Sequence, residues 1–395
     1  MRPEFGPSRE VGGRDPLDAR VLPRESPPAP TRLDVLLRSR AALGLAPAAA
    51  PAIVFVPLGM MLGPGGLNLL SVPVLAHASP LVSIGLAALG VFVGLGLGVR
   101  SRVDRRLFLA SAAETTTTLA LVAGVFGAWS ALAGDGLSAP VTLLVVALAV
   151  TAAASSAGAA EISRAPRHQL ATRIADLDDV LPIVVGGVLL GVTRDATPWM
   201  ALALVGATVG LGLVVAWATW LLLNAGAGDA ERIAFVAGML LLIGGGAAYL
   251  GLSTLLAGMA AGLFWSWAPG GGHERLRGQL ATIQHPVVVL VLILAGATIS
   301  FSWWVLALTV VFVLARLIGK LAGGRLAARM VGHDVPANLG VFLVAPGVIG
   351  IAFALNVHQV TDPAVGGLVL AVVALGSLLS ELLALWLLPL GAHEP

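Results

Sequence analysis

The chain has 395 residues, of which 57% are hydrophobic and 11% are charged, and its mean hydropathy is +0.94. A soluble domain carries about a quarter charged residues, so this composition excludes an ordinary soluble globule and indicates a membrane protein. The net charge is +2 and cysteine is absent, which excludes disulfides and cysteine-bound metal.

The amino-terminal residues 1–41 differ from the rest of the chain. The first forty contain eight arginines, six acidic residues and many prolines, without an apolar run. Such a segment cannot bury enough apolar surface to fold, and it lacks the apolar region of a secretory signal. We expect a disordered cytoplasmic tail at 1–41 and a transmembrane domain at 42–395.

From residue 43 onward, apolar segments follow one another at the length that crosses a bilayer, about 20 residues. They predict an all-α polytopic membrane protein with about twelve transmembrane helices. Two joins, at Gly251 and Trp303, are so short that neighbouring helices could be continuous. The expected spans are 43–63, 80–99, 106–129, 139–160, 171–193, 198–224, 231–249, 251–268, 285–302, 303–325, 337–357 and 364–390.

Arginines in the short connecting loops predict the orientation, because such loops are rich in Lys and Arg on the cytoplasmic side. Loops on one side carry nearly all of them, whereas those on the other side carry only Arg194. We therefore expect the protein to lie in the inner membrane, with both termini in the cytoplasm. The cytoplasmic set is Arg100, Arg102, Arg105, Arg106, Arg164, Arg167, Arg173, Arg232, Arg275, Arg277, Arg325 and Arg329.

Several charged residues lie inside the expected spans, where a charge is costly and usually marks a transport pathway or a buried pair. The set is Glu114, Asp176, Asp178, Asp179, Arg316 and Lys320, with Glu381 near the end of the last span. The four acids of the central group outnumber its two bases, which suits a cation and argues against an anion. The alternative is that the span at 171–193 starts later and its acids are a solvated helix entrance.

Lys320 is the only lysine among 23 cationic residues. Arginine stays charged, whereas a buried lysine can release a proton, so a lysine kept inside a membrane helix suggests proton chemistry. The alternative is a side chain that extends to the interface. At 1.5 Å per residue, Asp178 and Lys320 lie roughly 10 and 8 Å from the cytoplasmic ends of their spans. We expect them to pair, and Glu114 and Arg316 match in depth in the same way.

Asp178 and Asp179 are adjacent, so their side chains diverge by about 100° on a helix. One of them can face a water-filled cavity while the other faces Lys320. Asp176 lies three residues before Asp179 and shares its face. An ion site with two distinct carboxylate environments is therefore expected here.

Two expected spans contain helix breaks. Ser155, Ser156 and Gly158 belong to a run of small residues in the span at 139–160, and Pro346 and Gly347 interrupt the span at 337–357. Breaks at corresponding places in two halves are typical of inverted-repeat transporters. We expect the halves at about 106–193 and 303–390, with crossing discontinuous helices whose carbonyls and hydroxyls could ligate a hard cation.

The residues at 175–180 (ADLDDV) resemble the paired-aspartate motif of the monovalent cation:proton antiporter superfamily, the bacterial sodium/proton and potassium/proton exchangers. The residues at 316–320 (RLIGK) resemble the motif that carries the lysine of its electrogenic members. Three further segments are similar to its first, eighth and eleventh helices, and the resemblance covers about residues 50–390. These segments are 58–67, 251–262 and 345–352.

The resemblance implies a dimerisation domain beside a mobile core domain that moves like an elevator, and a homodimer in the lipid membrane. It implies that Asp179 is the principal carrier of sodium or potassium ions and protons, and that Asp178, in a salt bridge to Lys320, completes the monovalent-cation site. Asp176, Glu114, Arg316, Ser155 and Ser156 would support it. The chain departs from the family at Ser156–Ala157, where a polar residue and proline are common, and at Gly96, where an acid is frequent.

Other functions fit the sequence less well. A sodium-coupled symporter of organic anions would share the inverted-repeat architecture, but adjacent aspartates and a buried lysine do not suit it. An intramembrane aspartyl protease needs carboxylates that face each other from different helices, so no enzyme is expected. We expect no cofactor, no nucleic-acid partner and no nucleotide-binding regulatory domain, because no Gly-x-Gly-x-x-Gly motif follows the last span.

Overall fold

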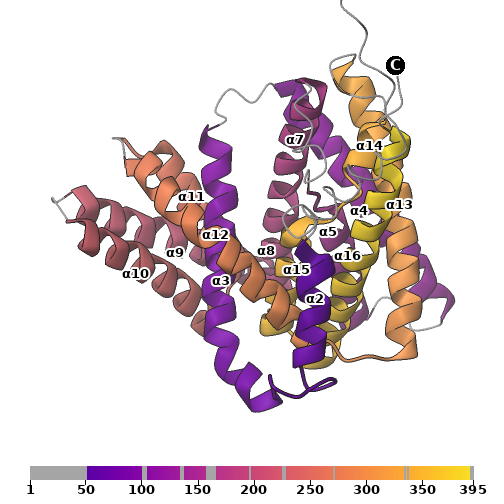
Figure 1. Cartoon of the computed structure of the whole chain (residues 1–395), viewed down its shortest axis with the longest axis horizontal. Coiled ribbons are helices and arrows are strands. Elements are labelled where there is room, and N and C mark those ends of the chain that lie inside the picture. Colours follow the sequence, from indigo (N-terminus) through magenta and orange to yellow (C-terminus); the bar gives the residue numbers. More distant parts are fainter. Residues whose placement is uncertain are drawn as a thin grey trace, which may run out of the picture. The chain divides into compact units, whose positions relative to one another are not determined.

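The computed structural model describes residues 51–99, 105–133, 138–156, 166–194, 197–224, 228–269, 272–332, 335 and 338–391. All regular structure within these ranges is helical (Figure 1). The expected tail at 1–41 lies outside them. The helices are α2 (Pro51–Leu62), α3 (Val72–Val99), α4 (Arg105–Leu132), α5 (Ala139–Ala153), α7 (Pro166–Asp178), α8 (Val180–Arg194), α9 (Pro198–Asn224), α10 (Asp229–Leu250), α11 (Thr254–Trp267), α12 (Gly272–Ala297), α13 (Trp303–Val331), α14 (Leu339–Phe342), α15 (Gly347–Val360) and α16 (Pro363–Gly391).

Each of the twelve expected spans corresponds to one helix or to a pair of consecutive helices, α7–α8 and α14–α15. Six helices of the described chain are long and apolar enough to cross a membrane, and shorter apolar segments lie in α2, α5, α11, α12 and α15. The expected starts at 80 and 285 are wrong, because α3 begins at Val72 and α12 at Gly272. The prolines near the expected starts, Pro80 and Pro286, lie inside these helices, which membrane helices tolerate.

The two short joins are genuine helix ends. Gly251 ends α10 with a φ of 64°, a left-handed conformation that glycine adopts without steric cost. Ser302 begins α13, since its side chain accepts a hydrogen bond from the Val305 amide at 3.2 Å. Neighbouring spans therefore do not merge at either place.

Exposed aromatic side chains mark two levels of the molecule. Trp199, Tyr249 and Trp303 are exposed at the start of α9, the end of α10 and the start of α13. Trp217 and Trp267 are exposed toward the other ends of α9 and α11. Trp199 and Trp217 are separated by about 27 Å along α9, close to the roughly 30 Å hydrocarbon thickness that such aromatic belts flank. The fold is that of a multi-pass membrane protein.

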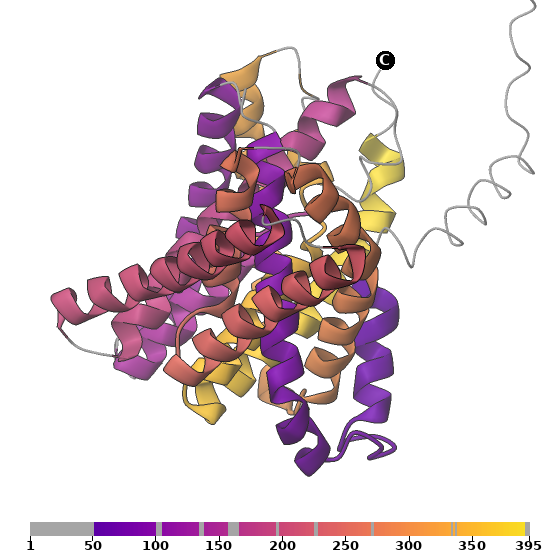
Figure 2. The same ribbon diagram turned by 90° about the vertical axis from the view of Figure 1, so that its left-hand side faces the viewer.

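The helices α2, α3, α9, α10, α11 and α12, here called the panel helices, pack beside one another (Figure 1). In Figure 2, α9 and α10 lie in front and run obliquely to α3. Glycines allow the close contact of α3 with α11. A Cβ atom at Gly258 or Gly262 would overlap the carbonyls of Ala87 and Val91, as expected for small residues four apart at a membrane helix interface.

The remaining helices, α4, α5, α7, α8, α13, α14, α15 and α16, here called the site helices, carry every intramembrane charge that the sequence singles out. Glu381 of α16 lies apart from the other charges. It is 3% exposed and accepts a hydrogen bond from the Ile53 amide at 3.2 Å. A carboxylate at a helix N-terminus is stabilised by the unpaired amides there, so Glu381 anchors the beginning of α2.

The two helix breaks meet among the site helices. α5 ends at Ala153 and the chain becomes extended at Ala154, where ψ is 142°. The Ser156 amide donates to the Ala345 carbonyl at 2.8 Å, which joins the breaks directly. Gly347 has a φ of 65°, and a Cβ atom there would lie 3.0 Å from the Ser156 Cβ. The break expected at Pro346 and Gly347 is therefore present. Gly158 lies outside the described residues.

Candidate functional site

The paired aspartates lie at an interruption of their span. α7 ends at Asp178 and α8 begins at Val180. Pro182 explains the interruption, because it has no N–H to donate to the Asp178 carbonyl four residues earlier. The ladder resumes with the Ile183 amide, which donates to the Asp179 carbonyl at 3.3 Å. This break was not predicted from the sequence, although Pro182 was its signal.

A buried ion-pair network joins α4, α7 and α13. Lys320 Nζ lies 3.0 Å from Glu114 Oε1 and 3.7 Å from Asp178 Oδ2, and all three side chains are 0% exposed. Lys320 also donates to the Ala153 carbonyl and to Ser155 Oγ, each at 2.6 Å. The structure thus places Lys320 between two carboxylates and the broken end of α5.

Three hydroxyl groups hold the Asp178 carboxylate. Ser111 and Thr115 donate to Oδ1 at 2.6 and 3.2 Å, and Ser155 donates to Oδ2 at 3.0 Å. Ser111 and Thr115 were not predicted from the sequence. Glu114 and Thr115 follow Ser111 by three and four residues, which places them near Ser111 on α4. Hydroxyl residues at this spacing beside a buried acid are a sequence signal that could have identified them.

Arg316 does not pair with Glu114, although the two match in depth. Its guanidinium donates to the Ala152 carbonyl at the end of α5 and to the Val344 carbonyl, at 3.2 Å, in the break before α15. The last carbonyls of a helix lack partners within the helix and carry partial negative charge. Arg316 therefore donates hydrogen bonds to carbonyls at both breaks, whereas Lys320 forms the ion pair with Glu114.

Asp179 lines a cavity of about 470 Å³, here called the Asp179 cavity. Asp176 and Gln284 also line it, together with Gly96 near the end of α3. Among the described residues, no group hydrogen-bonds Asp179 Oδ1, which is buried. The adjacent aspartates therefore have the two different environments that helix geometry predicts.

The formal charges of four buried side chains balance here: Glu114 and Asp178 oppose Lys320 and Arg316. Asp179 stands outside this balance and is the carboxylate of the pair that the cavity reaches. An unpaired carboxylate in a cavity can bind a proton or a cation, but not both at once. The Ser155 backbone, which also interacts with the Asp179 carboxylate, keeps the broken end of α5 beside it.

Ser156 contributes its backbone to the crossing of the breaks. Within the described residues, no group of three or more histidine and acidic side chains could hold a metal ion by itself. The expected monovalent cation would in any case be a transported substrate and not a resident cofactor. Its ligation by Asp178 and Asp179 stays a prediction.

Two discontinuous helices that cross within a bundle, beside a second bundle of helices, define a secondary-transporter fold. Within that class, the structure is similar to the sodium proton antiporter MjNhaP1 from Methanocaldococcus jannaschii at pH 8, with a TM-score of 0.63 and 17% sequence identity. The similarity covers 91% of this chain and 99% of that chain. The expected all-helical inverted-repeat antiporter fold is confirmed. No protein family model and no curated protein matches the sequence.

Proposed function

We propose that this protein exchanges a monovalent cation, sodium or potassium, for protons across the cytoplasmic membrane, with Asp179 as the carrier. The observation that supports this most is the Asp179 carboxylate, which lines a cavity and forms no ion pair among the described residues. A carboxylate that releases its proton before it binds a cation couples the two ions in opposite directions. The antiporter fold is consistent with this exchange.

Two cavities on opposite sides of a packed barrier support alternating access. The second, here called the His358 cavity, has a volume of about 880 Å³ and lies among α2, α3, α12 and α15. Along α15, the Asp179 cavity ends at Ile349 and the His358 cavity starts at Leu355. The barrier between them is about 9 Å thick on this helix. It contains fully buried side chains such as Leu86 and Val291.

The Asp179 cavity lies at the end of the molecule that carries Arg105, Arg173 and Arg329. Because arginines favour the cytoplasmic side, we assign this end to the cytoplasm and the structure to the inward-facing state. Movement of the site helices along the panel helices would carry Asp179 to the other side of the barrier. The exposed apolar faces of α9 and α10, with Leu202, Val214 and Leu241, would contact lipid or a second copy in a homodimer.

We also propose that exchange is electrogenic through Lys320. A cation that binds beside Asp178 competes with the ammonium group of Lys320, which lies 3.7 Å from that carboxylate. Release of the lysine proton, in addition to that of Asp179, would move two protons for each cation. The opposing influence is Glu114, whose 3.0 Å contact favours the charged lysine.

Proteoliposomes with an imposed proton gradient and an internal pH dye test the proposed exchange. Sodium, lithium, potassium and rubidium are added one at a time. Only the cations that the protein transports should discharge the proton gradient. The relative rates identify the preferred cation. If no cation changes the dye signal although the protein is folded and inserted, the proposed exchange is rejected. A gradient response that requires an organic anion would instead indicate a symporter.

A further inference from the structure

Two groups of polar side chains connect α15 with the panel helices on the side of the barrier opposite to Asp179. In the first, Asn356 Nδ2 donates to Ser253 Oγ at 2.9 Å, and Thr254 Oγ1 donates to Asn356 Oδ1 at 3.1 Å. All three side chains are buried, with Asn356 0% exposed. Both ends of this amide are therefore satisfied by residues at the start of α11.

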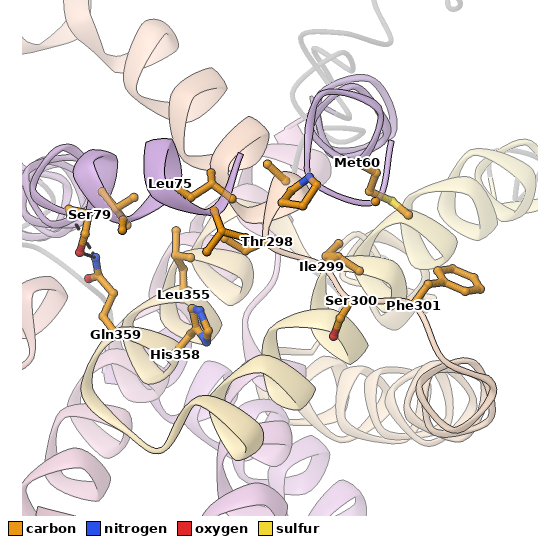
Figure 3. Close-up of a pocket in the computed structure, with 16 residues that line it drawn as sticks. Met60, Leu75, Ser79, Thr298, Ile299, Ser300, Phe301, Leu355, His358 and Gln359 are labelled. Carbon is orange, nitrogen blue, oxygen red and sulfur yellow. Dashed lines mark hydrogen bonds between the residues drawn. The ribbon is translucent and has the colours of Figure 1, made fainter. Parts of the chain in front are cut away.

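In the second group, Gln359 of α15 reaches α3. Its Nε2 donates to the Ser79 carbonyl at 3.2 Å and to Ser79 Oγ at 3.3 Å, and its Oε1 accepts from Ser83 at 3.4 Å. Figure 3 shows Gln359 extended to Ser79 at the edge of the His358 cavity, with Leu355 and His358 on the same helix. These bonds, like those of Asn356, run from a site helix to a panel helix.

The hydrogen bonds of both amides can break at low free-energy cost when α15 shifts in one direction only. A buried amide that loses its partners is costly unless water replaces them. Gln359 already borders the His358 cavity. A shift of α15 toward that cavity would expose the amides to its space, whereas the barrier closes the opposite direction with buried apolar side chains such as Leu86 and Val291.

We propose that Asn356 and Gln359 form an outer latch that joins α15 to α11 and α3 while Asp179 faces the cytoplasm, and that opens when the site helices move outward. The proposal rests on the proposed alternating-access function and adds the residues that set its resting state. Two amides with matching hydroxyl partners on two different panel helices hold α15 in one register. Their loss would shift the population toward the outward-facing state.

The absence of cysteine from the chain allows a direct test. Val348→Cys places one thiol in the Asp179 cavity on α15, and an impermeant maleimide reports whether that position is open to the outside. The pair Asn356→Leu and Gln359→Met removes the latch by replacing both amide groups with apolar groups on side chains of similar length. Loss of the cross-helix hydrogen bonds should raise the external labelling rate about tenfold, which corresponds to a population shift of about 1.4 kcal/mol.

The control is Thr208→Val, which removes a buried hydroxyl that bonds only within α9, at 2.7 Å to the Leu204 carbonyl. It should leave labelling unchanged. If the double variant does not fold, Ser79→Ala with Ser83→Ala removes the two hydroxyl bonds of Gln359 but keeps its bond to the Ser79 carbonyl, and should increase labelling in the same direction by a smaller factor. External labelling that stays at the parent rate in the folded latch variants would overturn the latch. Labelling needs no transport, so this outcome is distinct from an absence of exchange in the unmodified protein.

Discussion

Lys320 is the residue to which we assign the proposed charge movement. It is shared by Glu114 at 3.0 Å and Asp178 at 3.7 Å, so its proton is held by one carboxylate while a cation can approach the other. A guanidinium at the same place could keep both contacts but not release a proton.

Lys320→Arg should therefore retain exchange while its electrogenic component is lost or strongly reduced. Currents on solid-supported membranes, divided by the ion flux of the same preparation, measure this component. A ratio equal to that of the unmodified protein would assign Lys320 a structural role and leave the exchange itself in place.

The contributions of the two carboxylates around Lys320 to the free energy of unfolding should not be additive. Either Glu114→Gln or Asp178→Asn alone leaves the lysine one counter-charge, whereas the double variant leaves it buried with none. Removal of the last partner of a buried charge costs about 3–5 kcal/mol. Thermal unfolding in detergent should show a loss for the double variant well above the sum of the two single losses. Additive losses would mean that the carboxylates do not share the lysine.

Residue depth predicted which charges approach one another, but only in part. Height along the helices brings Asp178 to Lys320, and the structure places them as an ion pair. Height also matches Glu114 with Arg316, but the two do not pair, because depth does not specify the direction of a side chain around its helix. Arg316 instead binds carbonyls of the two breaks, and such carbonyl sites exist only after the breaks have come together.

At the scale of helices, the sequence predicts long apolar segments well and breaks unevenly. Pro346 and Gly347 identified the interruption before α15, whereas the interruption between Asp178 and Val180 was missed. Prolines are ambiguous in membrane helices, since Pro80 and Pro286 lie within continuous ones. Pro182 differs from them in its result, since α7 ends at Asp178 and α8 begins at Val180.

The contact of α3 with α11 depends on glycine. A Cβ atom at Gly258 would overlap the Ala87 carbonyl, whereas one at Gly238 of α10 meets nothing within 4 Å. Gly258→Ala should therefore destabilise the protein by about 1–3 kcal/mol through overpacking, and Gly238→Ala serves as the matched control. Thermal unfolding in detergent compares the two. Equal unfolding midpoints for the two variants would show that the contact of α3 with α11 tolerates a methyl group at Gly258.

At the scale of the whole molecule, the arginine distribution predicts an even number of spans with both ends in the cytoplasm. Leu132 is exposed at the end of α4 and should be external, and Arg329 is exposed in the last turn of α13 and should be cytoplasmic. In intact cells an impermeant maleimide should label Leu132→Cys and not Arg329→Cys. The reverse pattern would invert the orientation and assign the Asp179 cavity to the outside.

The most direct measurement of the central claim is cation-driven proton movement in proteoliposomes that contain Asp179→Asn. This change removes the titrating carboxylate and preserves its size, so exchange should fall to the rate of empty liposomes while the protein remains folded. Glu381→Gln is the matched control, because Glu381 is another buried carboxyl that lies at the start of α2 and outside the Asp179 cavity. Exchange by the control with none by Asp179→Asn is the predicted result. Exchange by Asp179→Asn at the rate of the unmodified protein would contradict the assignment of Asp179 as the carrier.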